Sequence, residues 1–266
     1  MTATMKAVVH DRYGGPEVLR VETVPRPVPD DDEVLVRVHA AAINRTDAGF
    51  RTASPFINRF FSGLLRPKYR VLGTEFAGVV VATGASVTTF AIDERVFGVN
   101  VGEFGTHAEY VCVKAARPIA TMPDSMTFEE GAGLCDGVVL ALTYLRKVGL
   151  GPQHRIMVYG ASGSIGTAGV QLAKQMGAHV TAVCSTATLE LVRSLGADEV
   201  IDYQTGDFLR SDTPYDYVFD AVGKLSLRRV SPVLKRGGTC GRRSRCGRVR
   251  TGWCKLTATS SQQARR

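Results

Sequence analysis

Seven residues between an apolar run and an amphipathic stretch carry the clearest chemical signal in this chain. They are Gly160, Ala161, Ser162, Gly163, Ser164, Ile165 and Gly166. Residues 155–159 before them are apolar and β-favouring, as in a buried parallel strand. Glycines here permit a tight turn, the close approach of a pyrophosphate and close helix packing, while the following helix offers N–H groups at its positive end. This pattern predicts dinucleotide binding, with a glycine-rich loop that holds no ligand as the alternative.

Length and composition are ordinary for a soluble enzyme. A chain of 266 residues has room for one large or two ordinary domains, and 44% hydrophobic with 22% charged residues is ordinary for such a protein. Residues 1–19 are too polar for a signal peptide, and no apolar run is long enough to span a membrane. Six scattered cysteines without a CxxC pair fit a reducing compartment. We therefore expect a cytoplasmic protein with no membrane partner.

The positive charge lies at the end of the chain. Residues 240–266 contain seven Arg and Lys255 but no acid, whereas residues 1–239 hold 25 basic and 25 acidic residues. Clustered arginines suggest a nucleic-acid partner as an alternative. The segment has a single aromatic residue, Trp253, and no basic face is evident elsewhere. We therefore do not expect nucleic-acid binding.

The N-terminal half is expected to be β-rich. Short apolar runs separated by Gly, Pro and Asp turns occur at 6–10, 33–38, 77–81, 95–98 and 108–113. Several strands at this spacing suggest a barrel-like domain. Residues 54–69 contain Phe56, Phe60, Phe61 and Leu64 and are interpreted as a loop or short helix. Its aromatic surface either covers an active site or packs locally.

From Phe128 onward the pattern changes to alternating helices and strands. Residues 128–148 and 187–195 are helix-like, and strand-like runs occupy 155–159, 179–184, 199–203 and 215–220. This alternation predicts an α/β fold with a doubly wound parallel sheet.

Several motifs together resemble the medium-chain dehydrogenase/reductase superfamily. They lie at 14–19, 42–47, 72–78, 108–110, 160–166, 195–198 and 220–223, in the order of the family. The resemblance covers residues 5–239. It implies a GroES-like alcohol dehydrogenase-type catalytic domain at 1–127, an NAD(P)-binding Rossmann domain at 128–239 and a basic irregular segment at 240–266. Family members transfer hydride between NAD(P)H and a substrate in the cleft between the two domains.

The zinc ligands of the related alcohol dehydrogenases are mostly replaced. Asn44 and Thr74 stand where the family has its first Cys and its His, and Cys135 matches the third ligand. An amide and a hydroxyl are poor substitutes for thiolate and imidazole around zinc. The family's structural-zinc cysteine cluster is also missing. We expect no zinc and interpret Cys135 as a buried helix cysteine, with a zinc-type alcohol dehydrogenase relative as the alternative.

The spacing Asn44-x-x-Asp47 resembles the zinc-independent quinone oxidoreductase-like branch. That resemblance implies NADPH-dependent reduction of a quinone or another conjugated carbonyl without metal. Catalysis then depends mostly on holding the nicotinamide against an electrophilic carbon of the substrate. The oxyanion that develops on the substrate needs a hydrogen-bond donor. We predict Asn44, Asp47 and Thr74 as catalytic residues, with the Asn44 amide and Thr74 hydroxyl as donors. Asp47 and Glu75 are assigned either orienting or merely structural roles.

The strand expected to border the adenosine of the cofactor, residues 179–184, ends without an acid. No carboxylate occurs between Gly166 and Glu190, which leaves room for the 2′-phosphate of NADPH. Ser185 is placed to bind that phosphate, and Tyr203 resembles a tyrosine that borders it in relatives. No Lys or Arg lies at 186–189, so NADPH is expected and NADH is the alternative. Val222 and Gly223 are the remaining predicted cofactor contacts.

The family resemblance ends near Gly238. Residues 240–246 show neither apolar alternation nor β-branched content. We expect a helix through Leu234, no fifth or sixth strand, and an unpaired sheet edge in a C-terminally truncated member. The homodimer contact of relatives would then be lost and catalysis weak. An inactive homologue that only binds nucleotide is the alternative.

Overall fold

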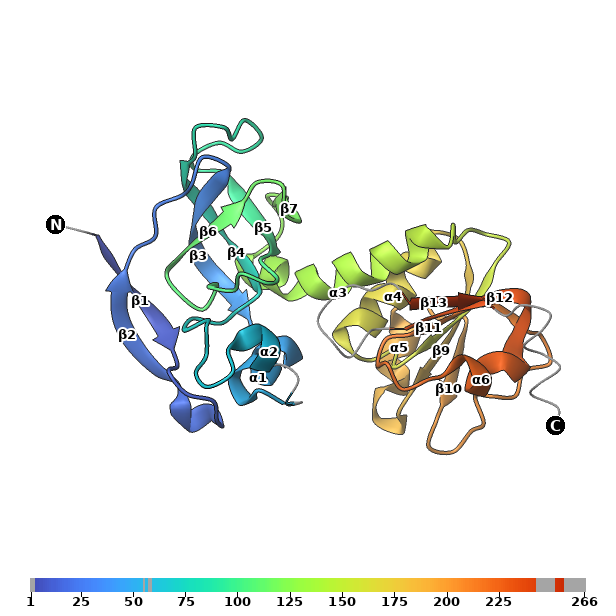
Figure 1. Ribbon diagram of the computed structural model, residues 1–266. Coiled ribbons are helices and arrows are strands. Elements are labelled where there is room, and N and C mark those ends of the chain that lie inside the picture. Colours follow the sequence, from blue (N-terminus) through green and yellow to red (C-terminus); the bar gives the residue numbers. More distant parts are fainter. Residues whose placement is uncertain (1–2, 55, 57–58, 243–251, 256–266) are drawn as a thin grey trace. The chain divides into compact units, whose positions relative to one another are not determined.

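The computed structural model describes residues 3–54, 56, 59–242 and 252–255. The chain divides into two compact units, Met1–Cys135 and Asp136–Arg266 (Figure 1).

The first unit contains two antiparallel sheets. One is the hairpin of β1 (Thr4–Val9) and β2 (Arg20–Pro25). The other has the order β6-β3-β4-β5-β7. Its strands are β3 (Glu33–Ala42), β4 (Glu75–Thr83), β5 (Arg95–Val99), β6 (Tyr110–Lys114) and β7 (Ile119–Thr121). Val34, Val36, Phe76 and Val80 are fully buried in its core. The predicted β-rich half is confirmed, although β2 and β7 were not among the predicted strands.

Two short helices connect β3 to β4, α1 (Arg45–Thr52) and α2 (Arg59–Ser62). The predicted aromatic segment contains α2. Phe56, Phe60 and Phe61 are exposed, with 62% of Phe56 and 69% of Phe60 accessible, whereas Tyr69 packs against Phe50 and Phe104. The described residues of this segment therefore combine an exposed aromatic surface with local packing at Tyr69.

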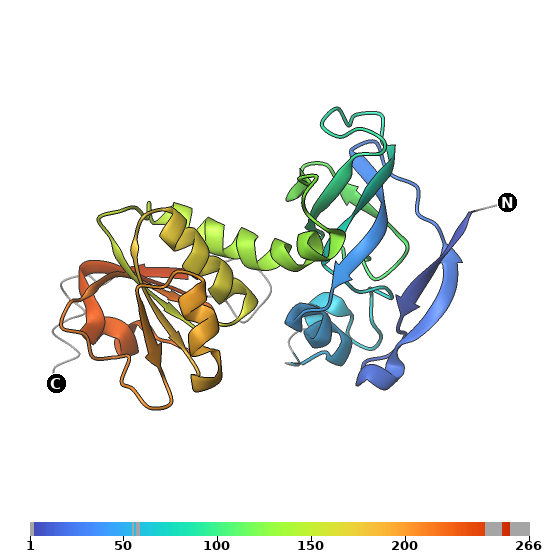
Figure 2. The ribbon, with the colours of Figure 1, turned by 180° about the vertical axis from the view of Figure 1, so that it is seen from behind.

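The second unit is built on one six-stranded sheet of order β10-β9-β8-β11-β12-β13. Its strands are β8 (Arg155–Tyr159), β9 (His179–Cys184), β10 (Glu199–Asp202), β11 (Tyr215–Asp220), β12 (Leu234–Arg242) and β13 (Gly252–Lys255). The helices are α3 (Phe128–Lys147, which begins in the first unit), α4 (Ser164–Gln175), α5 (Leu189–Ser194) and α6 (Leu227–Val230) (Figure 2). All strand pairs except β12–β13 are parallel. The predicted parallel α/β sheet is confirmed.

Successive side chains of the buried strands point to opposite faces of this sheet, and both faces are packed with apolar residues. Ile156 and Val158 pack in one apolar cluster with α3 and α4 residues, whereas Met157 packs in a second cluster with Val218 and Val230. A strand with side chains of period two needs apolar residues at every position when both of its faces are covered. The uninterrupted apolar run at 155–159 reflects this arrangement.

The prediction that the sheet stops at its fourth strand is wrong. β12 pairs in parallel with β11, with Val218 opposite Cys240, and β13 pairs antiparallel with β12. The predicted helix before Leu234 is confirmed as α6 followed by a 3-10 helix at Ser231–Val233, but it ends one residue early, because Leu234 begins β12. A buried strand such as β11 needs partners for its backbone N–H and C=O groups, and β12 supplies them despite its weak β propensity. The expected loss of a homodimer contact rested on the missing strands and stays a prediction.

The predicted irregular segment 240–266 is therefore regular at two places, the end of β12 and β13. Its remaining residues, 243–251 and 256–266, lie outside the described part of the chain.

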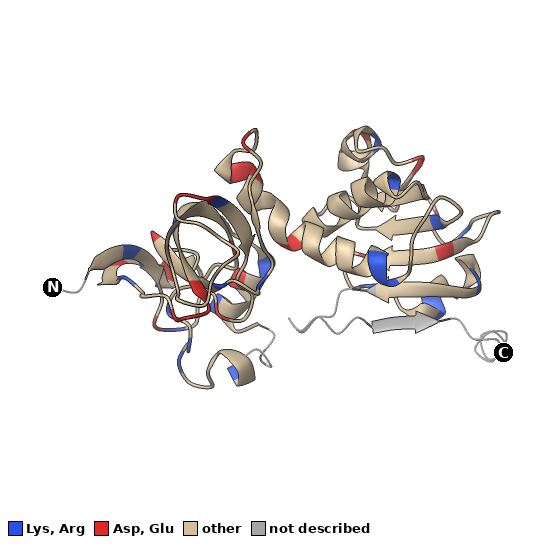
Figure 3. Ribbon diagram, turned by 90° about the horizontal axis from the view of Figure 1, so that it is seen from above, with Lys and Arg blue, Asp and Glu red and all other residues tan. Residues whose placement is uncertain are grey.

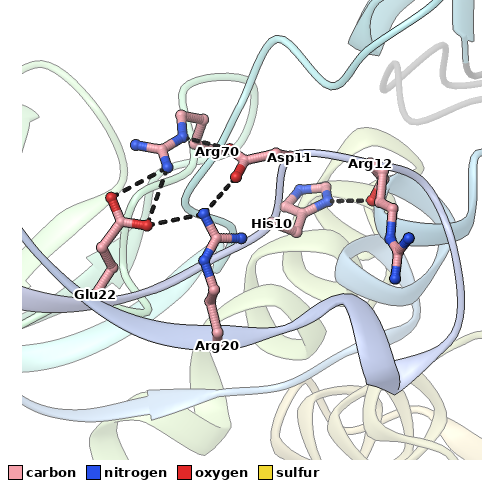
Figure 4. Close-up of polar contacts among 6 residues, drawn as sticks. All are labelled: His10, Asp11, Arg12, Arg20, Glu22 and Arg70. Atoms are coloured by element: carbon pink, nitrogen blue, oxygen red, sulfur yellow. Dashed lines mark hydrogen bonds and ion pairs between the residues drawn. The ribbon is translucent and has the colours of Figure 1, made fainter.

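Four charged residues join the β1–β2 hairpin to the segment before β4 (Figure 4). Arg70 Nε donates to Asp11 Oδ1 at 2.7 Å, and its Nη2 donates to Glu22 Oε2 at 3.2 Å. Arg20 also donates to both Asp11 and Glu22. The hydrogen bonds from Arg70 and Arg20 lower the pKa of Asp11 to about 2. This network is exposed, so its contribution to overall stability is small.

Charged side chains of both signs occur in both units, where Lys and Arg are interspersed with Asp and Glu (Figure 3). Within the described part of the chain, no helix combines the length and the apolar character that crossing a membrane requires.

Candidate functional site

The turn between β8 and α4 uses two of its glycines for its own geometry. Gly160 has φ +77°, a left-handed conformation that favours glycine, and a Cβ there would overlap Val222 Cγ2. A Cβ on Gly166 would overlap the carbonyl oxygen of Gly160. These two glycines thus hold the turn tightly against the first turn of α4 and against the residues that follow β11.

Gly163 differs from both of these glycines. It has φ −81° and ψ 164°, an extended backbone that any residue adopts, and a Cβ there would meet nothing closer than the Gly160 oxygen at 3.7 Å. It is also the N-cap of α4 and supplies no side-chain cap. The first N–H groups of a helix have no partner inside the helix, and Gly163 leaves them open to a ligand. This arrangement fits the pyrophosphate of a dinucleotide.

The loop after β11 lies beside this turn because β8 and β11 are neighbouring parallel strands. Asp220 is fully buried and accepts from the N–H groups of Val222 at 3.0 Å and Gly223 at 2.8 Å. Its other oxygen accepts from Leu225 N at 2.6 Å. The structure therefore brings Val222 and Gly223 to the predicted site, but their N–H groups are used by Asp220. The acid at the end of a buried strand was the available signal for this positioning role.

Ser185 and Tyr203 follow the ends of the neighbouring strands β9 and β10. Ser185 Oγ lies 3.3 Å from Thr188 Oγ1, and Tyr203 N donates to Cys184 O at 3.1 Å. The Tyr203 side chain is 46% exposed. Both predicted residues thus lie at the carboxyl edge of the sheet, which is where ligands bind in open α/β folds.

Asp202 brings a carboxylate to this region that the sequence interpretation missed. It lies opposite Cys184 in the β9–β10 register and accepts from Thr186 Oγ1 at 2.5 Å and from Gln204 N at 2.8 Å. The hydrogen bond from Thr186 is the main cause that lowers the pKa of Asp202. No acid occurs in residues 167–189, yet strand pairing places one beside the end of β9. The strand order, together with the acid at the end of the next strand, would have revealed it.

Asn44 begins helix α1 with a capping box. Its Oδ1 accepts from Thr46 N at 2.8 Å and from Asp47 N at 3.3 Å, and its own backbone N–H donates to Asp47 Oδ2 at 2.9 Å. Reciprocal bonds of this kind satisfy N–H groups that the helix leaves unpaired. The spacing of Asn44 and Asp47 is therefore explained by the start of α1.

The predicted catalytic residues of the first unit form one hydrogen-bonded group. Asn44 Nδ2 donates to Thr74 Oγ1 and to Glu75 Oε2, both at 2.8 Å, which uses both amide hydrogens. Asp47 Oδ1 accepts from Gly73 N at 3.1 Å. Asp47, Thr74 and Glu75 are buried. Burial raises the pKa of Asp47, although the N–H donors of Asn44 and Gly73 oppose that shift.

The same region contains the three positions that correspond to the zinc ligands of alcohol dehydrogenases. Cys135 is buried, and its thiol contacts the Gly131 carbonyl oxygen at 3.1 Å. Among the residues that the structure describes, no three His, Cys, Asp or Glu side chains are grouped so as to hold a metal ion. This set of groups does not fit a tetrahedral zinc, because it consists of an amide whose two hydrogens are both donated, a buried hydroxyl and one thiol. The absence of zinc stays a prediction.

Two family models match this chain. Residues 30–124 match the model described as alcohol dehydrogenase GroES-like domain, and residues 164–242 match that described as zinc-binding dehydrogenase. A quinone-oxidoreductase homolog of Spinacia oleracea, chloroplastic, is 33% identical over 88% of this chain and 73% of its own length. The chain belongs to the medium-chain dehydrogenase/reductase superfamily. Within this superfamily it is a quinone oxidoreductase-like member, with a GroES-like domain and a Rossmann-type domain.

Further comparisons support this placement in the superfamily. The human NAD(P)H oxidoreductase RTN4IP1, mitochondrial, is 36% identical over 88% of this chain, and an Arabidopsis thaliana NADPH-dependent alkenal/one oxidoreductase, chloroplastic, is 36% identical over the same share. The structure of the quinone oxidoreductase from Coxiella burnetii superposes with a TM-score of 0.83 at 28% identity, covering 99% of this chain and 81% of that one. The chain spans 64% and 61% of the length of the two relatives. Cytoplasmic localisation stays a prediction.

Proposed function

We propose that this superfamily member binds NADPH and reduces a quinone or another conjugated carbonyl by hydride transfer, without a metal. The printed names of its relatives include an NADPH-dependent alkenal/one oxidoreductase and a quinone-oxidoreductase homolog. Alkenals, alkenones and quinones all contain a carbonyl conjugated to a carbon–carbon double bond, and hydride transfer to such compounds needs no metal, which suits a site in which the donor set does not fit zinc.

The observation that carries the proposal is the open position at Gly163. Neither the backbone conformation nor neighbouring atoms require glycine there. The remaining physical reason for a glycine at position 163 is that it lets a phosphate of the ligand come close to the protein backbone. The N–H groups of the first turn of α4 would bind the pyrophosphate, and Ser185 and Tyr203 would border the adenosine 2′-phosphate.

When bound, NADPH supplies the hydride. The residues of this chain would orient the substrate and stabilise the negative charge that develops on its oxygen, and a proton from solvent water would complete the reduction. Asn44 and Thr74 are the proposed donors, with Asp47 holding the turn at Gly73. Because both Asn44 amide hydrogens are donated inside the protein, Asn44 would have to exchange one of these bonds for the substrate oxygen.

The internal hydrogen bonds of Asn44 favour a second candidate function, which is nucleotide binding without turnover. If Asn44 keeps both internal hydrogen bonds, its amide only caps α1 and fixes Thr74 and Glu75. The protein would then hold the dinucleotide but lack a donor for the substrate oxygen.

A turnover assay separates these two functions. NADPH oxidation is followed with a panel of quinones, 2-alkenals and saturated aldehydes, using the wild type and the variant Gly163→Asp. The proposal predicts oxidation with the conjugated acceptors and its loss in G163D, because a carboxylate at that position excludes the pyrophosphate. The variant Gly133→Asp, at an exposed glycine of α3, controls for the added charge. Binding of NADPH without oxidation of it by any acceptor would support the second candidate.

A further inference from the structure

The interior of helix α3 contains a buried glycine, Gly137, beside the first turn of α4. Glycine is less favourable than alanine in a helix interior, so a glycine at such a position usually has a packing reason. The candidate reason is the contact between α3 and Ser164, the residue that begins α4.

The surroundings of Gly137 leave no room for a methyl group. A Cβ on Gly137 would lie 2.5 Å from Ser164 Oγ, 2.7 Å from the Ser164 carbonyl oxygen and 2.9 Å from its carbonyl carbon. Two of these three atoms belong to the backbone, so a change of side-chain rotamer does not relieve the overlap. Either α3 or the first turn of α4 would have to move.

The first turn of α4 is also held from its other side. Gly166 packs so closely on Gly160 that a Cβ on Gly166 would overlap the Gly160 carbonyl oxygen. Displacing Ser164 therefore displaces the whole turn that precedes α4. Hydrogen bonds from N–H groups to phosphate oxygens weaken steeply as their distance and angle depart from the ideal values.

We propose that Gly137 is a positioning residue for the dinucleotide site. By letting the α3 backbone contact Ser164, it sets where the N–H groups of the first turn of α4 meet the pyrophosphate. This inference rests on the proposed dinucleotide binding and adds a residue outside the glycine turn to the determinants of affinity.

Gly133, one turn earlier in α3, is a matched control. It is exposed, and a Cβ there would meet no atom within 4 Å. Gly133→Ala and Gly137→Ala make the same chemical change in the same helix and gain the same helix propensity. The two variants differ in the contact with Ser164.

The test measures dissociation constants of two ligands for wild type, G133A and G137A. NADPH contains the pyrophosphate, whereas adenosine 2′-monophosphate contains the adenosine and 2′-phosphate only. G137A is expected to weaken NADPH binding by at least about tenfold while adenosine 2′-monophosphate binding changes by less than about twofold. G133A should bind both ligands as the wild type does. Should G137A alone fail to fold, the double variant G133A/G137A, with higher helix propensity in α3, takes its place.

The inference is overturned if folded G137A binds NADPH as tightly as G133A, or if it loses both ligands equally. Wild-type protein that binds neither ligand would instead refute the proposed dinucleotide binding, so the two failures are distinguishable.

Discussion

Asn44 Nδ2 lies 2.8 Å from Thr74 Oγ1, while the amide oxygen of the same side chain caps helix α1. One side chain thus joins the start of a helix to the start of β4 and orders the buried Thr74 hydroxyl. Its capping role and its proposed donor role are served by different atoms, the oxygen and the nitrogen. Substitutions that keep one atom and remove the other separate them.

Asn44→Ser keeps an oxygen that can cap α1 but removes both amide hydrogens, whereas Asn44→Ala removes cap and donors together. We expect N44A to be less stable than N44S by about 1 kcal/mol in urea unfolding, because only N44A loses the cap. Both variants should lose turnover, by roughly 100-fold in kcat, if the amide stabilises the developing oxyanion. Equal stabilities would contradict the capping role, and wild-type turnover in N44S would contradict the donor role.

Residue patterns were sufficient for the parts of the fold with strong periodicity. The apolar runs at 155–159, 179–184 and 215–220 became strands with those bounds. β12 was missed because Gly237, Gly238 and Gly241 dilute its apolar content, and its strand conformation depends on pairing with β11. Helix α1 has few apolar residues, but Asn44 followed by Asp47 is a capping-box spacing that would have predicted its start.

The candidate site likewise contains some residues that local sequence indicates and others that depend on contacts between distant parts of the chain. The glycine turn could be located from its own residues, because Gly160 and Gly166 have local backbone requirements and Gly163 has an open approach, while its binding of a cofactor stays a prediction. Asp202 and Gly137 could not be found locally, because the first reaches the site through the β9–β10 register and the second through helix packing. The engagement of both Asn44 hydrogens was equally invisible, since Thr74 and Glu75 are 30 and 31 residues away in the chain.

Asp202 should limit the preference for NADPH. Its carboxylate accepts from Thr186 just beyond β9 and opposes a phosphate at the adenosine 2′ position. Asp202→Asn retains an oxygen to accept from Thr186 but removes the charge. We expect this variant to bind NADPH about three- to tenfold more tightly, with NADH affinity nearly unchanged.

Asp212→Asn is the control for net charge, because Asp212 is an exposed aspartate of the same unit. Titrations of both cofactors with both variants give the comparison. An equal gain in the two variants would show that the effect is general electrostatics rather than a property of Asp202.

The ion network in Figure 4 should make stability fall in acid. The pKa of Asp11 is lowered to about 2 from an ordinary value of 3.8, mainly by the hydrogen bonds from Arg70 and Arg20. A carboxylate whose pKa is lower in the folded state adds stability above pH 3.8, and that stability is lost as the pH falls toward about 2. Asp11→Asn should therefore reduce the slope of unfolding free energy against pH in this interval.

Urea unfolding at a series of pH values measures that slope. Asp31→Asn, at an exposed aspartate for which the described residues provide no side-chain ion pair, should leave it close to the wild-type slope. A D11N protein with the full acid dependence of the wild type would show that the network does not carry the effect.

The central claim is that the turn at 160–166 binds a nicotinamide dinucleotide, and a fluorescence titration with NADPH tests it most directly. Gly163→Asp adds a preferred N-cap residue at a position with room for it, so the variant should be at least as stable as the wild type. We predict a wild-type dissociation constant of roughly 1–100 µM and at least about 100-fold weaker binding by G163D. The uncharged Gly163→Asn should lie between them. No saturable binding by the wild type, or equal binding by folded G163D, would contradict the account.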